Sequence, residues 1–254
     1  MKPILFTVGP FHVFAFGFFL SLAFLFSTFI VWKYGKEELK EEELLDAFIY
    51  TSLASLLSAR VFYIIFHFTE FGYNILKYVV FREAPGLSFV GGVIGGSFFL
   101  YYWAKKKKMN FAKTADIFSL AACLALSLGS LGEFLGGSTN GVETHNFWGV
   151  RIAGLSGVRH PVELYQSFIL FVLFILLSFI YNKHLQKKTD GLLALLFIFI
   201  SSVIISVLEF LKTGPLYLYN RLSLNQAAAI GFMLITVYPL IKKFKEIHGR
   251  GYKK

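Results

Sequence analysis

Residues 11–32 read FHVFAFGFFLSLAFLFSTFIVW, a run of apolar and aromatic side chains without a formal charge. A transmembrane helix needs about 20 mostly apolar residues, so this run is long enough to cross a bilayer. It exceeds the apolar core of a secretory signal peptide, about 7–15 residues, and Trp32-Lys33-Tyr34 at its end offers no small-residue cleavage site. We therefore expect a membrane span that is retained in the protein.

Six later runs have the same character. They are continuously apolar rather than alternating, which favours helices over the strands of a barrel, and in lipid only these two structures satisfy the backbone hydrogen bonds. Together with residues 11–32 they predict an all-α integral membrane protein with seven transmembrane helices. The six runs are residues 47–66, 87–104, 117–135, 164–181, 191–211 and 224–241.

The composition of the 254 residues excludes other classes of protein. Hydrophobic residues make up 56 % and charged residues 16 %, whereas an ordinary soluble domain has about 45–50 % and about 25 %. The 31 Phe and 13 Tyr exclude a disordered chain, and a single Cys excludes a disulfide framework or a cysteine metal cluster. We expect one polytopic membrane domain over residues 1–254, with a small loop region at 136–163.

Basic residues predict the orientation of the chain. Residues 33–46, 104–114 and 182–190 and the tail from 242 hold 17 of the 25 Lys and Arg residues, whereas the alternate connections hold six. Because cytoplasmic loops carry the excess of Lys and Arg, we expect the N-terminus outside, the C-terminus in the cytoplasm and loop 136–163 on the outer face. The net charge of +10 is therefore a topology signal, and we expect no nucleic-acid partner.

Four charged residues fall within or at the ends of the predicted spans, where lipid makes a charge costly and a functional role is the default reading. Arg60 lies inside the second span, and its guanidinium could pair with a carboxylate, reach the interface or hold a lipid phosphate. Glu133 and Glu209 lie near the outer ends of their spans, and Lys212 shares a helix face with Glu209. They predict a local ion pair, a cation for an anionic headgroup, or carboxylates that couple protons in a transporter.

Two glycine-rich segments lead to different predictions. The first has glycines four residues apart, a spacing that lets helix backbones approach closely, so we assign it to helix packing. The second, residues 129–138, combines glycines with Ser130 and a carboxylate, and a helix break there could expose backbone amides to a ligand. The glycines of the first segment are Gly91, Gly92, Gly95 and Gly96.

The string RHPVELYQ, which begins at Arg159, is the most informative polar segment. Pro161 suits the first turn of a helix, where its missing N–H costs nothing, so the string marks the start of the fifth span. His160 would then lie at the outer interface, with Glu163 and Tyr165 in the first helical turns. Because a helix N-terminus attracts anions, these side chains predict either a site for an anionic ligand or a basic and aromatic interfacial belt.

Several motifs resemble the bacterial prolipoprotein diacylglyceryl transferase family, in the order in which that family has them. RHPVELYQ resembles the family's RHPSQLYE, and GP followed by FG resembles its GP…YG start. Four further strings resemble its AR-x-FY, LSFHGG-x-IG, E-x-FR and LSMGQ motifs, so the resemblance covers nearly the whole chain. These strings are ARVFY at 59–63, LSFVGGVIG at 87–95, EFLK at 209–212 and LSLNQ at 222–226.

The resemblance implies a multi-pass protein of the bacterial cytoplasmic (inner) membrane, with seven helices and its N-terminus outside. It implies transfer of a diacylglyceryl group from phosphatidylglycerol, or another anionic phospholipid, to the lipobox cysteine thiol of an exported prolipoprotein. Glycerol phosphate would be the leaving group. The thiol belongs to the acceptor, so Cys123 needs no catalytic role, and we expect neither a cofactor nor a metal.

By the same resemblance, a base assists the thiol, and cations stabilise the leaving phosphate. The residues expected in the catalytic group are His160, Glu163, Tyr165 and Glu133. The residues expected to bind the phospholipid phosphate are Arg60, Arg159, Lys212, Ser130 and Gln226.

Some positions differ from the family's motifs. Val90 stands where LSFHGG has His, and Lys212 stands where E-x-FR has Arg. Against the family's GRIGNFINGE, Ser130 replaces the Arg and Glu133 replaces the first Asn, while the acid and the amide of RHPSQLYE have exchanged places. These differences leave two alternatives open: a member that acts on another lipid or acceptor, with Glu133 as a new base, and a non-catalytic lipid-binding homologue.

Overall fold

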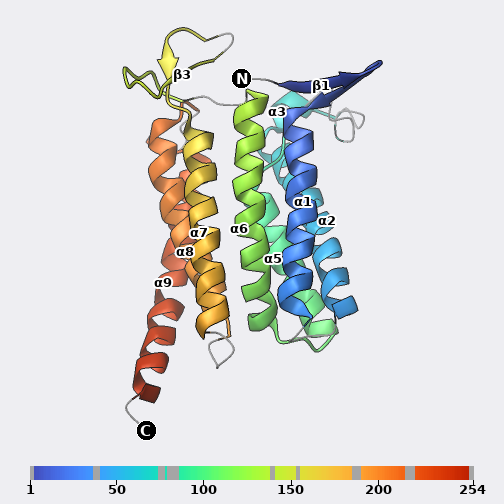
Figure 1. Ribbon diagram of the computed structural model, residues 1–254, viewed down its shortest axis with the longest axis vertical. Coiled ribbons are helices and arrows are strands. Elements are labelled where there is room, and N and C mark those ends of the chain that lie inside the picture. Colours follow the sequence, from blue (N-terminus) through green and yellow to red (C-terminus); the bar gives the residue numbers. More distant parts are fainter. Residues whose placement is uncertain are drawn as a thin grey trace. The chain divides into compact units, whose positions relative to one another are not determined.

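The computed structural model of this protein describes residues 3–36, 41–73, 78, 86–137, 141–152, 155–184, 190–214 and 221–251. Long helices dominate these residues, and two short hairpins accompany them (Figure 1). The helices are α1 (Ala15–Gly35), α2 (Glu41–Phe66), α3 (Phe68–Phe71), α5 (Phe89–Lys106), α6 (Phe111–Gly136), α7 (Val162–His184), α8 (Leu192–Leu208), the 3-10 turn η2 (Glu209–Leu211) and α9 (Leu224–Gly251). The strands are β1 (Ile4–Val8), β2 (Phe11–Phe14), β3 (Val150–Arg151) and β4 (Val158–Arg159).

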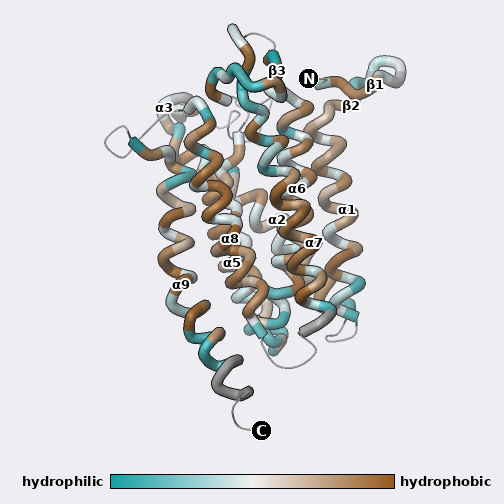
Figure 2. The backbone as a smooth tube through the Cα atoms, turned by 60° about the vertical axis from the view of Figure 1, so that its left-hand side comes forward, coloured by the Kyte–Doolittle hydropathy of each residue, from teal (hydrophilic) through white to brown (hydrophobic). Residues whose placement is uncertain are grey.

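Six of the described helices are long and apolar enough to cross a membrane: α1, α2, α6, α7, α8 with η2, and α9. Figure 2 shows apolar residues along the middle of the helices and hydrophilic residues toward their ends. The chain is therefore a multi-pass helical membrane protein. α5 has 18 residues, but its glycines, tyrosines and terminal lysines lower its hydropathy, so a seventh span stays a prediction.

The start of the first span differs from the prediction. The apolar run predicts a helix from residue 11, but α1 begins at Ala15, and the four residues before it form β2. β2 pairs antiparallel with β1, and the register joins Val8 to Phe11, so Gly9 and Pro10 make a two-residue turn. Gly9 has a φ of 59°, which glycine adopts without strain. The first helix therefore begins later than predicted, because apolar side chains suit a strand as well as a helix, while the candidate membrane spans are helical.

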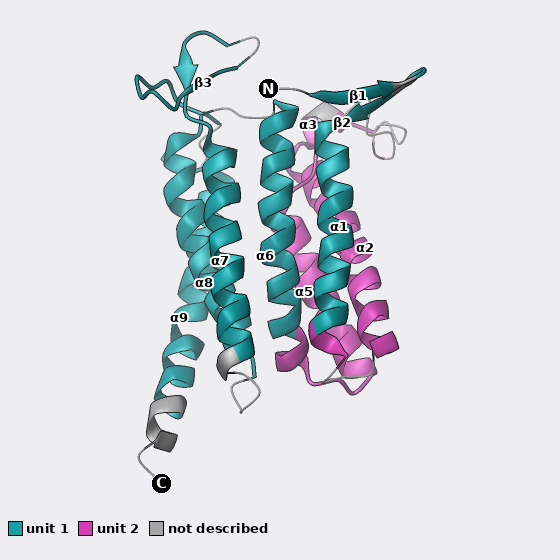
Figure 3. Ribbon diagram, viewed as in Figure 1, with its two compact units in different colours: residues 1–33, 115–254 teal, residues 34–114 magenta. Residues whose placement is uncertain are grey.

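The chain folds as two compact units (Figure 3). Unit 1 comprises residues 1–33 and 115–254, and unit 2 comprises residues 34–114. In unit 2, α2 packs against α5, whereas in unit 1 α8 packs against both α7 and α9. The single polytopic membrane domain expected from the sequence stays a prediction.

In unit 2, the glycines of α5 lie against α2. Ser55 Oγ donates a hydrogen bond to the carbonyl oxygen of Gly92 at 2.9 Å. A Cβ atom added at Gly91 would overlap the side chain of Phe62, so the two backbones approach more closely than a larger residue would permit. The glycines that face α2 in this way are Gly91, Gly92, Gly95 and Gly96.

Replacing Gly91 by alanine is expected to destabilise the protein by about 1–3 kcal/mol, the usual cost of overpacking. The new methyl group would overlap Phe62 and lie 2.8 Å from the carbonyl oxygen of Ser58. Thermal unfolding of the purified protein in detergent measures the effect. Gly17→Ala in α1 is the matched control, because nothing lies within 4 Å of a Cβ added there. Equal unfolding temperatures for the two variants would contradict the close contact.

In unit 1, small polar side chains of α6 join it to α7. Ser127 Oγ donates to the carbonyl oxygen of Ser167 at 2.8 Å, and Cys123 Sγ donates to that of Leu170 at 3.2 Å. Such side chains let membrane helices pack closely and hydrogen-bond across the contact. Cys123 is buried, so the single cysteine serves this packing.

Asp116 of α6 caps the N-terminus of α8. Its carboxyl accepts hydrogen bonds from the backbone amides of Gly191 at 2.6 Å and Ala194 at 2.8 Å. Gly191, at the N-cap position, has no side chain to do this, so the acceptor comes from another helix. Lys243 of α9 donates to the carbonyl oxygen of Asp190 in the same turn, at 2.8 Å. Three helices are thus joined at one end of α8.

Asp116→Ala is expected to lower the free energy of unfolding by about 1–3 kcal/mol, since buried amides at the start of α8 would lose a charged acceptor. The unfolding temperature in detergent measures this loss. Asp46→Ala is the control, because no hydrogen bond or ion pair of Asp46 is found among the described residues. If both variants unfold at the same temperature, Asp116 does not support α8.

Candidate functional site

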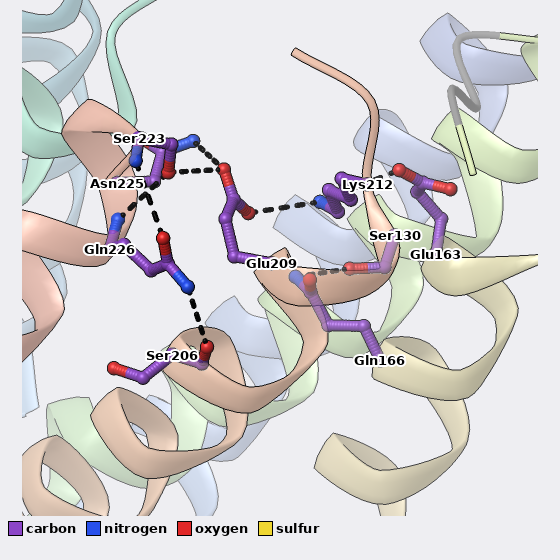
Figure 4. A network of polar contacts seen from close by, with 9 residues as sticks. All are labelled: Ser130, Glu163, Gln166, Ser206, Glu209, Lys212, Ser223, Asn225 and Gln226. Carbon is purple, nitrogen blue, oxygen red and sulfur yellow. Dashed lines mark hydrogen bonds and ion pairs between the residues drawn. The ribbon is translucent and has the colours of Figure 1, made fainter. Parts of the chain in front are cut away.

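Polar side chains from several segments of unit 1 gather around Lys212 (Figure 4). They come from the C-terminal end of α6, the first turns of α7, the end of α8 with η2, and the N-terminus of α9. These segments are distant in sequence, so the fold alone brings them together. The residues of this cluster are Ser130, Glu163, Gln166, Ser206, Glu209, Lys212, Ser223, Asn225 and Gln226.

Lys212 is the cation at the centre of the cluster. It follows η2, and its backbone amide donates to the carbonyl oxygen of Glu209 at 3.1 Å. Its Nζ lies 3.4 Å from Oε1 of Glu163 and 3.8 Å from Oε2 of Glu209. The Lys212 side chain is 25 % exposed, whereas those of Glu163 and Glu209 are 6 % and 10 % exposed. Lys212 is therefore the most exposed of the three side chains in a largely buried ion cluster.

Glu163 lies in the first turn of α7, directly after Pro161 and Val162. Its Oε1 faces Lys212, whereas its Oε2 is buried and has no hydrogen-bond partner among the described residues. A buried polar atom without a partner is uncommon, and it costs about 1–3 kcal/mol. This oxygen can therefore accept a proton or a hydrogen bond from a ligand.

Glu133, in the last turn of α6, adds a third carboxyl group. It interacts electrostatically with Lys212, which attracts it, and with Glu163, which repels it. Glu163 and Glu209 form ion pairs with Lys212, whereas Glu133 interacts with it only through the electrostatic field.

Glu209 is held by the start of α9. Its Oε1 accepts hydrogen bonds from Ser223 Oγ at 2.8 Å and from Asn225 Nδ2 at 3.4 Å. Ser223 and Gln226 form a capping box: Ser223 Oγ accepts from the Gln226 amide at 3.1 Å, and Gln226 Oε1 accepts from the Ser223 amide at 3.3 Å. Gln226 Nε2 donates to the carbonyl oxygen of Ser206 at 3.2 Å. Gln226, an expected phosphate ligand, thus uses both ends of its side-chain amide within the protein.

Arg159 fastens the loop that precedes α7. Its Nε donates to the carbonyl oxygen of Ser156 at 3.1 Å, and its Nη1 donates to that of Gly141 at 3.0 Å. Its Nη2 lies 3.2 Å from Oε1 of Glu143. Gly141 also pairs with Lys212 through an isolated β-bridge. Arg159 is therefore joined to the cluster through the backbone of this loop.

His160 and Tyr165 form a second pair in the same region. The Nδ1 atom of His160 lies 3.2 Å from the Tyr165 hydroxyl. The backbone amide of His160 donates to the carbonyl oxygen of Val142 at 3.0 Å. These contacts place the imidazole beside the phenol at the start of α7.

Arg60 lies in unit 2, on α2, with 7 % of its surface exposed. Its Nε donates to the carbonyl oxygen of Tyr78 at 3.1 Å, and its Nη1 donates to that of Gly86 at 3.0 Å. Its guanidinium carbon lies 5.2 Å from the ring centroid of Phe71. Arg60 thus connects α2 to the chain that follows it, and its role as a phosphate ligand stays a prediction.

Five cluster residues were not among the residues expected in the catalytic or phosphate-binding groups: Gln166, Ser206, Glu209, Ser223 and Asn225. A signal for Ser223 exists in the sequence, because Ser followed three residues later by Gln is a capping-box pattern. Gln166 is one turn beyond Glu163 on α7, so it shares a face with an expected residue. Nothing in the sequence indicates the contact of Asn225 with Glu209, which depends on tertiary structure.

The comparison with known proteins decides the family. A family model described as prolipoprotein diacylglyceryl transferase matches residues 3–242. The chain belongs to the prolipoprotein diacylglyceryl transferase family. Two relatives, each named phosphatidylglycerol–prolipoprotein diacylglyceryl transferase, match nearly end to end. The protein of Clostridioides difficile is 31 % identical over 251 residues, 96 % of this chain and 98 % of that protein. The protein of Finegoldia magna is 27 % identical over 248 residues, 97 % and 98 % of the two chains.

Positions at which this diacylglyceryl transferase family member differs from the motifs of its family contact one another. Ser130 stands at the motif's Arg and Gln166 at its Glu, and Gln166 Nε2 donates to Ser130 Oγ at 3.0 Å. Two neutral side chains joined by a hydrogen bond thus stand where the motif has an Arg and a Glu. Glu163 stands at the motif's Gln and contacts Lys212, which stands at its Arg. The acid has therefore moved by one helical turn, to the side where the cation of this chain lies.

Proposed function

We propose that this protein transfers a diacylglyceryl group from phosphatidylglycerol to the cysteine thiol of an exported prolipoprotein. Family membership over residues 3–242 and relatives of nearly equal length with this name support the proposal. The structural observation that best supports the proposal is the ion pair between Lys212 and Glu163. Transfer needs a cation for the leaving phosphate and a base for the thiol in one place, and these two side chains supply both.

In the proposed reaction, the acceptor's sulfur attacks the glycerol carbon that is bonded to the phosphate oxygen. The S–C bond forms while the C–O bond breaks, and the electrons of that bond leave with the oxygen of glycerol phosphate. The thiol proton passes to Oε2 of Glu163, because a thiol with a pKa of about 8.5 needs a base to become a thiolate at neutral pH. Lys212 stabilises the charge that develops on the leaving phosphate.

The other expected site residues would act around this pair. His160 and Tyr165 would orient the acceptor thiol, and Glu133 would hold the ammonium of Lys212 toward the site. For the phospholipid phosphate, the Ser130 hydroxyl would donate a hydrogen bond and Gln226 would act through the α9 cap. Arg159 would add positive charge, although it also donates to two backbone carbonyls.

Release of the headgroup tests this function. Purified protein is placed in lipid nanodiscs that contain phosphatidylglycerol labelled in its headgroup glycerol, and a lipobox peptide is added. We expect labelled glycerol phosphate to appear only when the peptide has cysteine, and not serine, at the acceptor position. Release that ignores the peptide would favour another acceptor, such as water. Binding without release would favour a non-catalytic lipid-binding protein.

We also propose that α5 is a seventh span, that the N-terminus lies outside, and that the protein resides in the bacterial inner membrane. A helix of 18 residues is about 27 Å long at 1.5 Å per residue, close to the thickness of about 30 Å of a hydrocarbon core. The basic connections then face the cytoplasm, and the loop before α7, with the site beside it, faces outward.

Cysteine labelling of intact cells is expected to follow this orientation. Phe147→Cys, at a residue that is 93 % exposed, should react with an impermeant maleimide. Lys107→Cys should react only after the cells are permeabilised, because it lies in a connection expected in the cytoplasm. The native Cys123 is buried and provides the unlabelled background. The reverse pattern of labelling would contradict the orientation.

A further inference from the structure

The two carboxyl groups that face Lys212 differ in how they are held. Glu163 has one oxygen without a partner among the described residues. Both oxygens of Glu209 are in use, since Oε2 lies 3.8 Å from Lys212 Nζ and Oε1 accepts from Ser223 at 2.8 Å and Asn225 at 3.4 Å. A carboxylate with this many donors is oriented in one way. Glu209 therefore suits the task of orienting its neighbour rather than that of accepting a proton.

Lys212 requires such a partner. Its ammonium is a compact charge on a flexible four-carbon stem, and 25 % of the side chain is exposed. The backbone brings Lys212 back over Glu209, because the Lys212 amide donates to the Glu209 carbonyl oxygen at 3.1 Å. The backbone thus brings the two residues together, and the Glu209 carboxylate selects where the ammonium lies.

The Ser223 hydroxyl determines the orientation of Glu209. A serine hydroxyl has one proton to donate and can accept through its lone pairs. Ser223 Oγ accepts from the backbone amide of Gln226 at 3.1 Å, so its single proton is available for Glu209. Gln226 in turn is held by the amide of Ser223 and by the carbonyl oxygen of Ser206. A series of hydrogen bonds therefore runs from the cap of α9 to Glu209, and the ion pair between Glu209 and Lys212 at 3.8 Å continues it to the cation of the site (Figure 4).

We propose that Glu209 and Ser223 are positioning residues for Lys212, and that the N-terminal cap of α9 sets the place of the cation that meets the phosphate. This inference rests on the proposed function for the role of Lys212. Ser223 acts through Glu209, and Glu209 acts through Lys212, so neither is a catalytic residue. Displacing a catalytic group by about 1 Å can cost about 10²-fold in rate, which is the size of effect we expect.

Substitutions at Ser223 separate this role from helix capping. Ser223→Thr keeps both the cap and the donor to Glu209. Ser223→Asp keeps the cap, since Asp is a good N-cap residue, but it has no proton for Glu209 and repels it. We expect Ser223→Asp to lower kcat/KM for transfer by about 10²-fold, with the unfolding temperature close to that of Ser223→Thr. Equal activity of the Asp and Thr variants would overturn the proposal.

Two further measurements show whether the effect passes through Lys212. In a Lys212→Gln background, Ser223→Asp should cause no additional loss, because residues that act in series are not additive. A further 10²-fold loss there would overturn the proposal. Ser88→Ala is the control for loss of a cap alone, because Ser88 Oγ accepts from the Gly91 amide at 3.2 Å at the start of α5. It should lower stability without changing kcat/KM.

A failure of the proposed function would be distinguishable from a failure of this inference. If the wild-type protein transfers no lipid, the function is wrong, and the positioning of Lys212 is then measured by binding to phosphatidylglycerol nanodiscs. Ser223→Asp should weaken this binding about tenfold relative to Ser223→Thr, as a 1.4 kcal/mol change would. Equal binding of the two variants would overturn the inference by itself.

Discussion

Lys212→Gln is expected to lower kcat/KM for diacylglyceryl transfer by about 10²–10³-fold, the usual loss when one group that stabilises developing charge is removed. Glutamine keeps a donor for the Glu163 oxygen that Lys212 now contacts at 3.4 Å, so the change removes charge more than structure. The rate of lipid transfer to a lipobox peptide, at several concentrations of phosphatidylglycerol in nanodiscs, measures the loss.

The matched control is Lys212→Arg. Arginine keeps the positive charge and adds a planar donor pair that fits a phosphate, and the family's E-x-FR motif has Arg at this position. We expect this variant to retain most of the activity. The unfolding temperature of each variant shows whether the buried carboxyl groups still fold without their cation. A folded Lys212→Gln variant with full activity would exclude Lys212 from the phosphate site.

Glu163→Gln is expected to lower kcat by about 10²–10⁴-fold, the range for loss of a general acid–base group, while phosphatidylglycerol binding persists. The substitution is nearly isosteric and leaves an oxygen to face Lys212, but the atom in place of Oε2 can no longer accept the thiol proton. Single-turnover transfer and nanodisc binding, measured on the same sample, separate the two effects. Unchanged transfer by this variant would mean that another group takes the proton.

A compensating series tests why the acid lies where it does. Glu163→Gln with Gln166→Glu moves the carboxyl to the motif's position, where its neighbour is Ser130 rather than Lys212. We expect activity to stay low until Ser130→Arg is added, because the displaced acid would otherwise have no cation beside it. Full activity of the double variant would show that the place of the acid is unimportant.

Much of the architecture could be predicted because membrane helices depend on long apolar runs. Six helices that fit a membrane overlap predicted runs, and the family resemblance that the motifs indicated is confirmed. The predicted start of the first helix was wrong, because the apolar run that predicts the helix continues through the residues that form β2. The glycine spacing indicates a close helix contact, but it cannot name the partner, which the structure gives as α2.

Less of the candidate site could be predicted from the sequence. A charge at the end of a span marks Lys212 as a candidate, and the RHPVELYQ string marks Glu163, but their contact joins two segments that are distant in sequence. Whether a polar side chain is free to bind a ligand depends on its hydrogen bonds to residues distant in sequence, which a local sequence pattern does not contain. Gln226 is the example, because a motif made it an expected ligand while the structure shows its amide bonded to Ser223 and Ser206.

Mass spectrometry of the acceptor peptide tests the central claim most directly. Purified protein in phosphatidylglycerol nanodiscs is incubated with a synthetic lipobox peptide, and the intact mass of the peptide is measured, with the Lys212→Gln variant and a serine peptide as controls. The account predicts a mass gain of one diacylglyceryl group on the cysteine peptide, made by the wild-type protein and nearly absent in both controls. An unchanged peptide, from folded protein that binds phosphatidylglycerol, would contradict it.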